Sequence, residues 1–239
     1  MDRKRINPII YGFATAATLV GGMALGIVAA SVLSEALPGH MAARNTVAVI
    51  PALAGILGSG ALWGWTMDRL ARTGEARRMA LAGALGFSAP AILAMLSLFA
   101  LEETAVNMFR LITNQPPQIH RIFTLLFVPT AAILAATGSG ALGAALRNYP
   151  LARRLALSAG LAGGAGFLVV NLAMEALGWQ VGGPGAAERA TMITVLAVGC
   201  LGAALAAGTA VGANLSRYVA GMPEVSAGAV TAEVGKNPA

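Results

Sequence analysis

Two polar side chains near the end of a long apolar run are spaced so that they could act together on a solute or ion. Asn171 and Glu175 are four residues apart, which places both on one face of a helix. Ser31 and Glu35 repeat this spacing near the end of the first apolar run. A carboxylate inside a helical membrane bundle can bind a cation or relay a proton. We therefore take Asn171, Glu175 and Glu35, with Glu102 at the end of the third run, as a candidate solute or ion path.

The same acids also fit an interpretation without transport. Acids end three of the apolar runs and bases begin the runs that follow, namely Glu35, Glu102 with Glu103, and Glu175, then Arg44, Arg121 and Arg189. In one hypothesis the carboxylates converge on an outward-facing acidic vestibule. In the other, each acid pairs with the arginine of its own hairpin at the membrane interface, where such a pair contributes little energy. Asn171 then makes an ordinary hydrogen bond between helices.

The residue types that catalysis and cofactor binding need are scarce. The chain has two histidines, His40 and His120, and one cysteine, Cys200, which do not readily supply the three or four ligands of a zinc site. Ser59 and Ser139 each lie in a Gly-Ser-Gly motif, but no histidine or lysine in the apolar runs could act as their base. We expect no enzyme activity, no cofactor and no metal, and we expect Cys200 to be a small core residue. A pigment or metal ligand at His120 is left open.

Composition indicates the class of protein. Of the 239 residues, 57% are apolar and 11% are charged, and the mean hydropathy is +0.73. About 20 apolar residues are needed to cross roughly 30 Å of hydrocarbon. Six runs of about this length are present: Ile9 to Leu33, Thr46 to Trp65, Met79 to Leu101, Ile122 to Leu146, Leu155 to Leu177 and Met192 to Val211. The predicted fold class is all-α, a polytopic membrane bundle of six transmembrane helices.

A short motif recurs within these runs. Gly-Ser-Gly-Ala-Leu stands at 58–62 and again at 138–142. Alignment on it, with a weaker third copy, gives three pairs of small residues four apart: Gly60 with Gly64, Gly140 with Ala144, and Gly208 with Gly212. Such pairs let helix backbones approach closely in lipid. We predict that they are helix-packing faces of three tandem two-helix hairpins, 9–73, 79–150 and 155–218, around a pseudo-three-fold axis along the membrane normal.

The segments outside these spans are short. Residues 1–8 form a basic head, residues 9–218 the six-helix domain, and residues 219–239 a tail rich in proline, glycine and alanine that we expect to be flexible. Between the third and fourth runs, Thr104 to His120 is predicted to be an irregular outer loop with a short interfacial helix. Trp63 and Trp65 are predicted to belong to an interfacial aromatic belt.

The basic residues are distributed unevenly. If the helices alternate in direction, 12 of the 16 lysines and arginines lie on the side of the N-terminus. This asymmetry predicts a multi-pass protein of the cell inner (plasma) membrane with both termini in the cytoplasm. The formal charge of +6 then indicates anionic lipid headgroups on the cytoplasmic face, and no nucleic acid, as the partner.

Two functional hypotheses of different classes follow. Small-residue faces and few polar groups inside the runs favour a structural or accessory subunit of a larger membrane complex, with other membrane subunits or further copies of itself as partners. The alternative is a small-solute or ion transporter or channel with an outward-facing acidic vestibule, which would need a continuous polar path.

Overall fold

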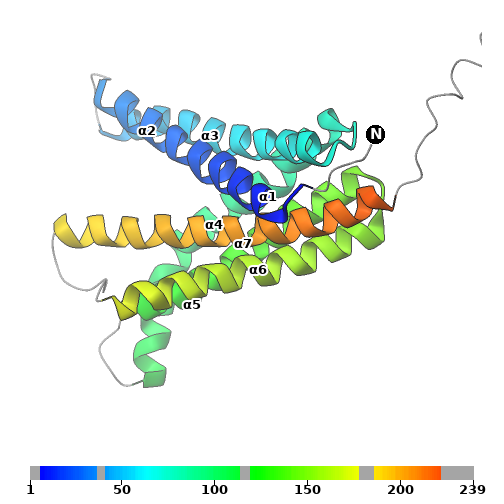
Figure 1. Cartoon of the computed structure of the whole chain (residues 1–239). Helices are drawn as coiled ribbons and strands as arrows, with labels where there is room; N and C mark the ends of the chain where they lie inside the picture. The colour runs from blue at the N-terminus through cyan, green and yellow to red at the C-terminus, as the bar shows by residue number, and fades with distance from the viewer. Residues whose placement is uncertain (1–5, 37–40, 114–118, 178–185, 222–239) are drawn as a thin grey trace, which may run out of the picture.

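The chain forms a bundle of helices in a computed structural model that describes residues 6–36, 41–113, 119–177 and 186–221 (Figure 1). Within these ranges, the side chains of 34, 41–48, 95–113, 119–125 and 186–193 lie outside the description. The predicted basic head lies mostly outside it, and so does the tail from residue 222 onward.

Six helices account for nearly all of the described residues. The first consists of α1 (Pro8–Thr15), the π-helical segment η1 (Ala16–Val20) and α2 (Gly21–Ala36). The others are α3 (Met41–Ala71), α4 (Ala76–Thr113), α5 (Ile119–Ala145), α6 (Tyr149–Ala176) and α7 (Ala186–Ala220). Five of them are long and apolar enough to cross a membrane, over Pro8–Leu33, Val49–Ala71, Leu126–Ala145, Tyr149–Ala176 and Thr194–Ala220. The all-helical class is confirmed, and the helices are compatible with a membrane protein.

Local sequence explains where two helices begin. Asn7 precedes Pro8, and its side chain accepts a hydrogen bond from the Ile9 backbone N–H at 3.0 Å. Asn148 does the same for α6, accepting from the Leu151 N–H at 2.9 Å with Pro150 in the first turn. An asparagine cap followed by proline is a strong start signal, because proline lacks the N–H that a helix start leaves unpaired.

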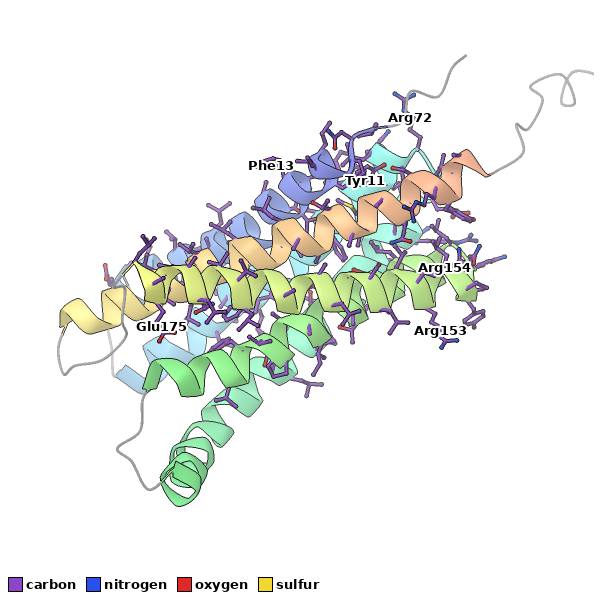
Figure 2. All side chains as sticks on the ribbon, turned by 60° about the horizontal axis from the view of Figure 1, so that its bottom comes forward. Tyr11, Phe13, Arg72, Arg153, Arg154 and Glu175 are labelled. Carbon is purple, nitrogen blue, oxygen red and sulfur yellow. The ribbon has the colours of Figure 1, made fainter. Side chains whose placement is uncertain are left out.

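The predicted irregular connection does not begin at Thr104, and the short helix predicted within it is the continuation of α4. The helix that begins at Ala76 continues without interruption to Thr113. Residues 102–113 contain no glycine and no proline, so nothing in this stretch stops a helix before Asn114 and Pro116. In both views the last part of α4 projects away from the rest of the bundle (Figures 1 and 2).

The helices pack in a closed ring. Each helix contacts the helix before it and the helix after it in the sequence, and α7 packs against α1 to complete the circle. The short connections 72–75 and 146–148 lie at the end where α1 begins and α7 ends (Figure 1). This end is called the terminal end below.

Large buried side chains from all six helices belong to one cluster near the terminal end. Each of the six helices contributes one side chain that is at most 2% exposed, and all six belong to one cluster: Tyr11, Met67, Met79, Leu142, Leu155 and Leu215. Elsewhere many large apolar side chains are exposed, among them Phe13 at 64% and Leu161 at 75%. A bundle that is apolar outside as well as inside is the expected form in lipid.

Two sequence-based interpretations of single residues need correction. Trp63 is buried inside the bundle and not in an interfacial belt, whereas Trp65 is exposed with the Arg69 guanidinium 5.1 Å from its ring centre. The two indoles are two residues apart, so they point to different sides of α3. Cys200 is exposed on α7 and is not a core residue.

Candidate functional site

The helix-packing faces predicted on α3 lie against α4. A Cβ built on Gly60 would lie 2.5 Å from the carbonyl oxygen of Gly83, and one on Gly64 would clash with the carbonyl of Met79. Cβ atoms essentially never approach other atoms this closely, so only glycine fits at both positions at this helix separation. The two residues are four apart and therefore share one face of α3.

The third pair, on α7, lies against the first helix. A Cβ on Gly212 would lie 2.5 Å from the ring of Tyr11, and one on Gly208 would lie 2.7 Å from the Tyr11 carbonyl oxygen and collide with Thr15. This contact closes the ring. Both partners are fully buried, so the seam lies in the interior.

The middle pair, on α5, departs from the predicted face. Gly140 approaches α6 less closely than Gly60 approaches α4, because a Cβ there would lie 3.3 Å from the Cβ of Ala156. Ala144 is exposed, and the neighbouring Gly143 is buried tightly against Ala152 instead. One residue corresponds to about 100° of rotation in an α-helix, so alignment on the motif missed which small residue contacts α6.

Glycine also occupies the three remaining contacts of the ring. A Cβ on Gly55 of α3 would lie 2.6 Å from the Cα of Gly26 in α2, and a Cβ on Gly166 of α6 would lie 2.6 Å from the carbonyl of Gly202 in α7. Gly86 of α4 lies directly against Ala141 of α5. Every pair of neighbouring helices therefore meets at a glycine that no larger residue could replace without displacement.

The Asn171 side chain lies between α6 and α7. Its Nδ2 donates to the carbonyl of Phe167, one turn earlier in α6, at 2.9 Å. The amide is half-buried and lies against Gly199 of α7, where a Cβ would be 2.8 Å away. Phe167 is buried and stacks on Phe127 of α5 with ring centres 6.0 Å apart. Asn171 thus belongs to the packed seam between α6 and α7.

Of the acids predicted to form a path, Glu175 and Glu35 have described side chains. Glu175 is half-buried near the far end of α6, away from the terminal end (Figure 2). Glu35 is exposed in the last turn of α2. The side chains of Glu102 and His120 lie outside the described residues. The same holds for Arg44, Arg121 and Arg189, the predicted partners of the acids.

Most of the buried polar side chains that the structure describes are hydroxyls: Thr15, Ser59, Ser88 and Ser139. The indole Nε1–H of Trp63 donates to Thr15 Oγ1 at 3.0 Å, and this hydroxyl donates to the Tyr11 carbonyl at 2.7 Å. Ser88 of α4 donates to the carbonyl of Ile56 in α3 at 3.0 Å. Sequence reasoning missed these bonds, because a lone Trp or Ser in an apolar run carries no pairing signal.

An open apolar groove runs along the outside of α1, α6 and α7. Its volume is about 640 Å³. Small residues form much of the α6 and α7 part of its surface, including Ala162, Ala165, Gly166, Gly202 and Ala206. Larger apolar side chains that line it are exposed: Ile9 at 53% and Phe13 at 64% on α1, and Val169 at 64% on α6. The groove extends for about 12 Å along α6, at roughly 1.5 Å per residue over 162–170.

Arginine dominates the described surface of the terminal end. Eight arginines there are exposed: Arg69, Arg72, Arg77, Arg78, Arg147, Arg153, Arg154 and Arg217. The acidic side chains at the α3–α4 turn already have hydrogen-bond or ion-pair partners. Buried Asp68 accepts hydrogen bonds from Thr73 Oγ1 and from the Glu75 backbone N–H, and Glu75 pairs with Arg78 at 2.9 Å. The end therefore presents a strongly positive face.

Comparison of the chain with protein-family models, with curated proteins and with solved structures finds no match. Among the described residues, no three histidine, cysteine or acidic side chains gather where they could hold a metal ion.

Proposed function

We propose that this protein is a structural or accessory subunit of a larger membrane complex, and that a transmembrane helix of a partner subunit occupies the groove between α1, α6 and α7. The observation that carries the proposal is the shape of this groove. Its lining combines small residues of α6 and α7 with larger apolar residues of α1, α6 and α7. In lipid, helices associate through close packing at small residues, which is also how every neighbouring pair in this ring meets.

The closed interior supports the same function. Six large buried side chains, one from each helix, belong to one cluster near the terminal end, and the indole of Trp63 donates to the Thr15 hydroxyl, which donates to the Tyr11 carbonyl. A channel needs a lining of polar groups that remain available to the solute. A subunit that acts through its outer surface needs only a stable bundle.

The internal repeat is part of the proposal. The contacts α3/α4, α5/α6 and α7/α1 each join the second helix of one hairpin to the first helix of the next. A glycine makes the close approach in all three, at Gly60, Gly143 and Gly208. A close glycine contact at each of these three junctions supports three tandem hairpins around a pseudo-three-fold axis, with Gly143 in the place of Gly140, the residue that aligns with Gly60 and Gly208.

Orientation and location are proposed on the charge distribution. The exposed arginines of the terminal end stand beside the start of α1 and the end of α7. Because positively charged segments remain on the cytoplasmic side, this end faces the cytoplasm of the inner (plasma) membrane. Anionic lipid headgroups are its expected surroundings, since a positive face near the membrane attracts them.

A direct test is to place a larger side chain in the groove. Ala165→Leu places a larger side chain on an exposed position of its lining, and Ala54→Leu makes the same change at an exposed position of α3 outside the groove. Purification in mild detergent followed by quantitative mass spectrometry should give a stoichiometric membrane partner with the wild type and Ala54→Leu. Ala165→Leu should lose it. No stoichiometric partner, or one that Ala165→Leu retains, contradicts the docking proposal.

One observation favours transport as the second candidate. The π-helical segment η1 interrupts the first helix directly after Thr15, and Thr18 bonds back to the carbonyls of Ala14 and Thr15. Short π segments are frequent at functional sites, and this one is next to the buried Trp63–Thr15 hydrogen bond. Flux of cations or protons into liposomes that contain the purified protein would favour this candidate.

A further inference from the structure

A second cavity lies at the terminal end, where α6 begins and α7 ends. Its volume is about 450 Å³. The side chains that matter for its chemistry are Asn148, Leu151 and Arg154 from the start of α6, and Asn214, Arg217 and Tyr218 from the end of α7. Two guanidinium groups, two amides and a phenol line it together with apolar carbon, and no carboxylate does.

The polar groups of this cavity are mostly hydrogen-bond donors. Each guanidinium offers several N–H donors and a permanent positive charge. The Oδ1 of Asn148 is occupied by the Leu151 N–H at 2.9 Å, so its NH₂ group is what remains to offer. Asn214 donates to Ser158 Oγ at 3.0 Å and thereby ties α7 to α6, which holds the two walls of the cavity together.

The two arginines reach the cavity from different helix ends. Arg217 is in the last turn of α7, where a cation is favourable. Arg154 is near the N-terminus of α6, where the helix itself is partly positive and no acidic residue stands in the first turn. A cation near a positive helix end is favourable only if an anion comes to it, and none of the lining residues supplies one.

We propose that this cavity binds a phosphate group between Arg154 and Arg217, with the NH₂ of Asn148 and the hydroxyl of Tyr218 as further donors. Guanidinium groups recognise phosphate oxygens through paired, charge-assisted hydrogen bonds. The cavity lies where the apolar helices end, and Leu151 adds an apolar wall. The headgroup of an anionic phospholipid has this combination of phosphate and adjoining hydrocarbon. The inference depends on the membrane placement and not on the subunit role, because it can be measured on the isolated protein.

Matched charge variants provide the test. Arg154→Gln with Arg217→Gln removes both guanidinium groups of the cavity, whereas Arg77→Gln with Arg153→Gln removes the same charge from exposed arginines that do not line it. Figure 2 shows Arg153 and Arg154 as neighbours near the start of α6. Native mass spectrometry of the purified full chain, titrated with phosphatidylglycerol, measures binding. The cavity variant should bind at least about tenfold more weakly than the wild type, and the control variant should bind as the wild type does.

A second arm separates a lipid from a soluble phosphate. Sodium phosphate is added to the protein in detergent, with sodium chloride at equal ionic strength as the reference, and the melting temperature is measured. A phosphate-dependent rise in the wild type that the cavity variant lacks would assign the site to a soluble phosphate compound. No rise, with specific phosphatidylglycerol binding, assigns it to a lipid. Equal binding of both ligands by the cavity and control variants would overturn the proposal. If the double variant does not fold, Arg217→Gln alone, at an exposed position, is compared with Arg153→Gln.

Discussion

The indole of Trp63 in α3 donates a hydrogen bond to the hydroxyl of Thr15 in the first helix, 48 residues away, with 3.0 Å between Nε1 and Oγ1. Both side chains are at most 3% exposed. Thr15 is also the residue against which Gly208 of α7 packs. The contact therefore joins three helices at the place where the ring closes, next to the π-helical segment that begins at Ala16.

A double-mutant cycle on this pair tests its contribution. Trp63→Phe removes the N–H and keeps most of the aromatic volume, and Thr15→Val removes the hydroxyl and keeps the branched shape. Each change should destabilise the protein, and their coupling should be about 0.5 to 1.5 kcal/mol, the range for hydrogen bonds between membrane helices. Unfolding of the detergent-solubilised protein measures it. Strictly additive effects would contradict a direct bond.

Two glycines of one motif give a matched test of close packing. A Cβ on Gly60 would lie 2.5 Å from the Gly83 carbonyl, whereas nothing lies within 4 Å of a Cβ on Gly58. Gly60→Ala should therefore destabilise by about 1–3 kcal/mol, as overpacking does. Gly58→Ala should be neutral or slightly stabilising, because alanine favours helix. Thermal unfolding of both variants is the measurement, and equal effects would show that the α3/α4 seam is not tightly packed.

The sequence was sufficient for the class of fold and insufficient for its contacts. Six runs of apolar residues predicted the helices, because span length is set by membrane thickness. The sequence-based end of α4 is wrong, because the polarity changes at Glu102 while no glycine or proline follows until Pro116. Polarity indicates where a helix leaves lipid, and only breakers or caps indicate where it stops.

For the candidate site, too, some features could be predicted from the sequence and others could not. The glycine faces of α3 and α7 could be named from spacing, because small residues four apart have one structural use in lipid. Gly143 was missed in favour of Ala144, since a sequence alignment carries no information on helix rotation. The groove and the arginine-lined cavity could not be predicted, because both are formed by residues from two or three helices that only the packing brings together.

The proposed topology makes a prediction for chemical labelling. In a Cys200→Ser background, single cysteines at Arg72 and Lys236 should react with a membrane-impermeant maleimide only after the membrane is made permeable. Cysteines at Gly39 and Gly183 should react in intact cells. An odd number of predicted spans lies between the N-terminus and each of these two positions, which places both on the side of the membrane opposite the termini. Labelling of Gly39 and Arg72 from the same side would contradict six alternating spans.

The last prediction decides between the subunit and transport hypotheses at Glu175. Glu175 is half-buried near the far end of α6, and Asn171, one turn before it, hydrogen-bonds its own helix. If Glu175 is an interfacial anchor, Glu175→Gln should lower the free energy of unfolding by under about 1 kcal/mol and change no flux. If it lines an ion path, the substitution should abolish flux into liposomes while the bundle stays folded, because binding a cation or relaying a proton there requires the carboxylate. Glu35→Gln, at an exposed acid in the last turn of α2, is the matched control and should have the smaller effect. We expect the first outcome for both variants, since the interior contacts of α6 are those of a packed seam. Wild-type flux that Glu175→Gln eliminates would replace the subunit hypothesis with transport.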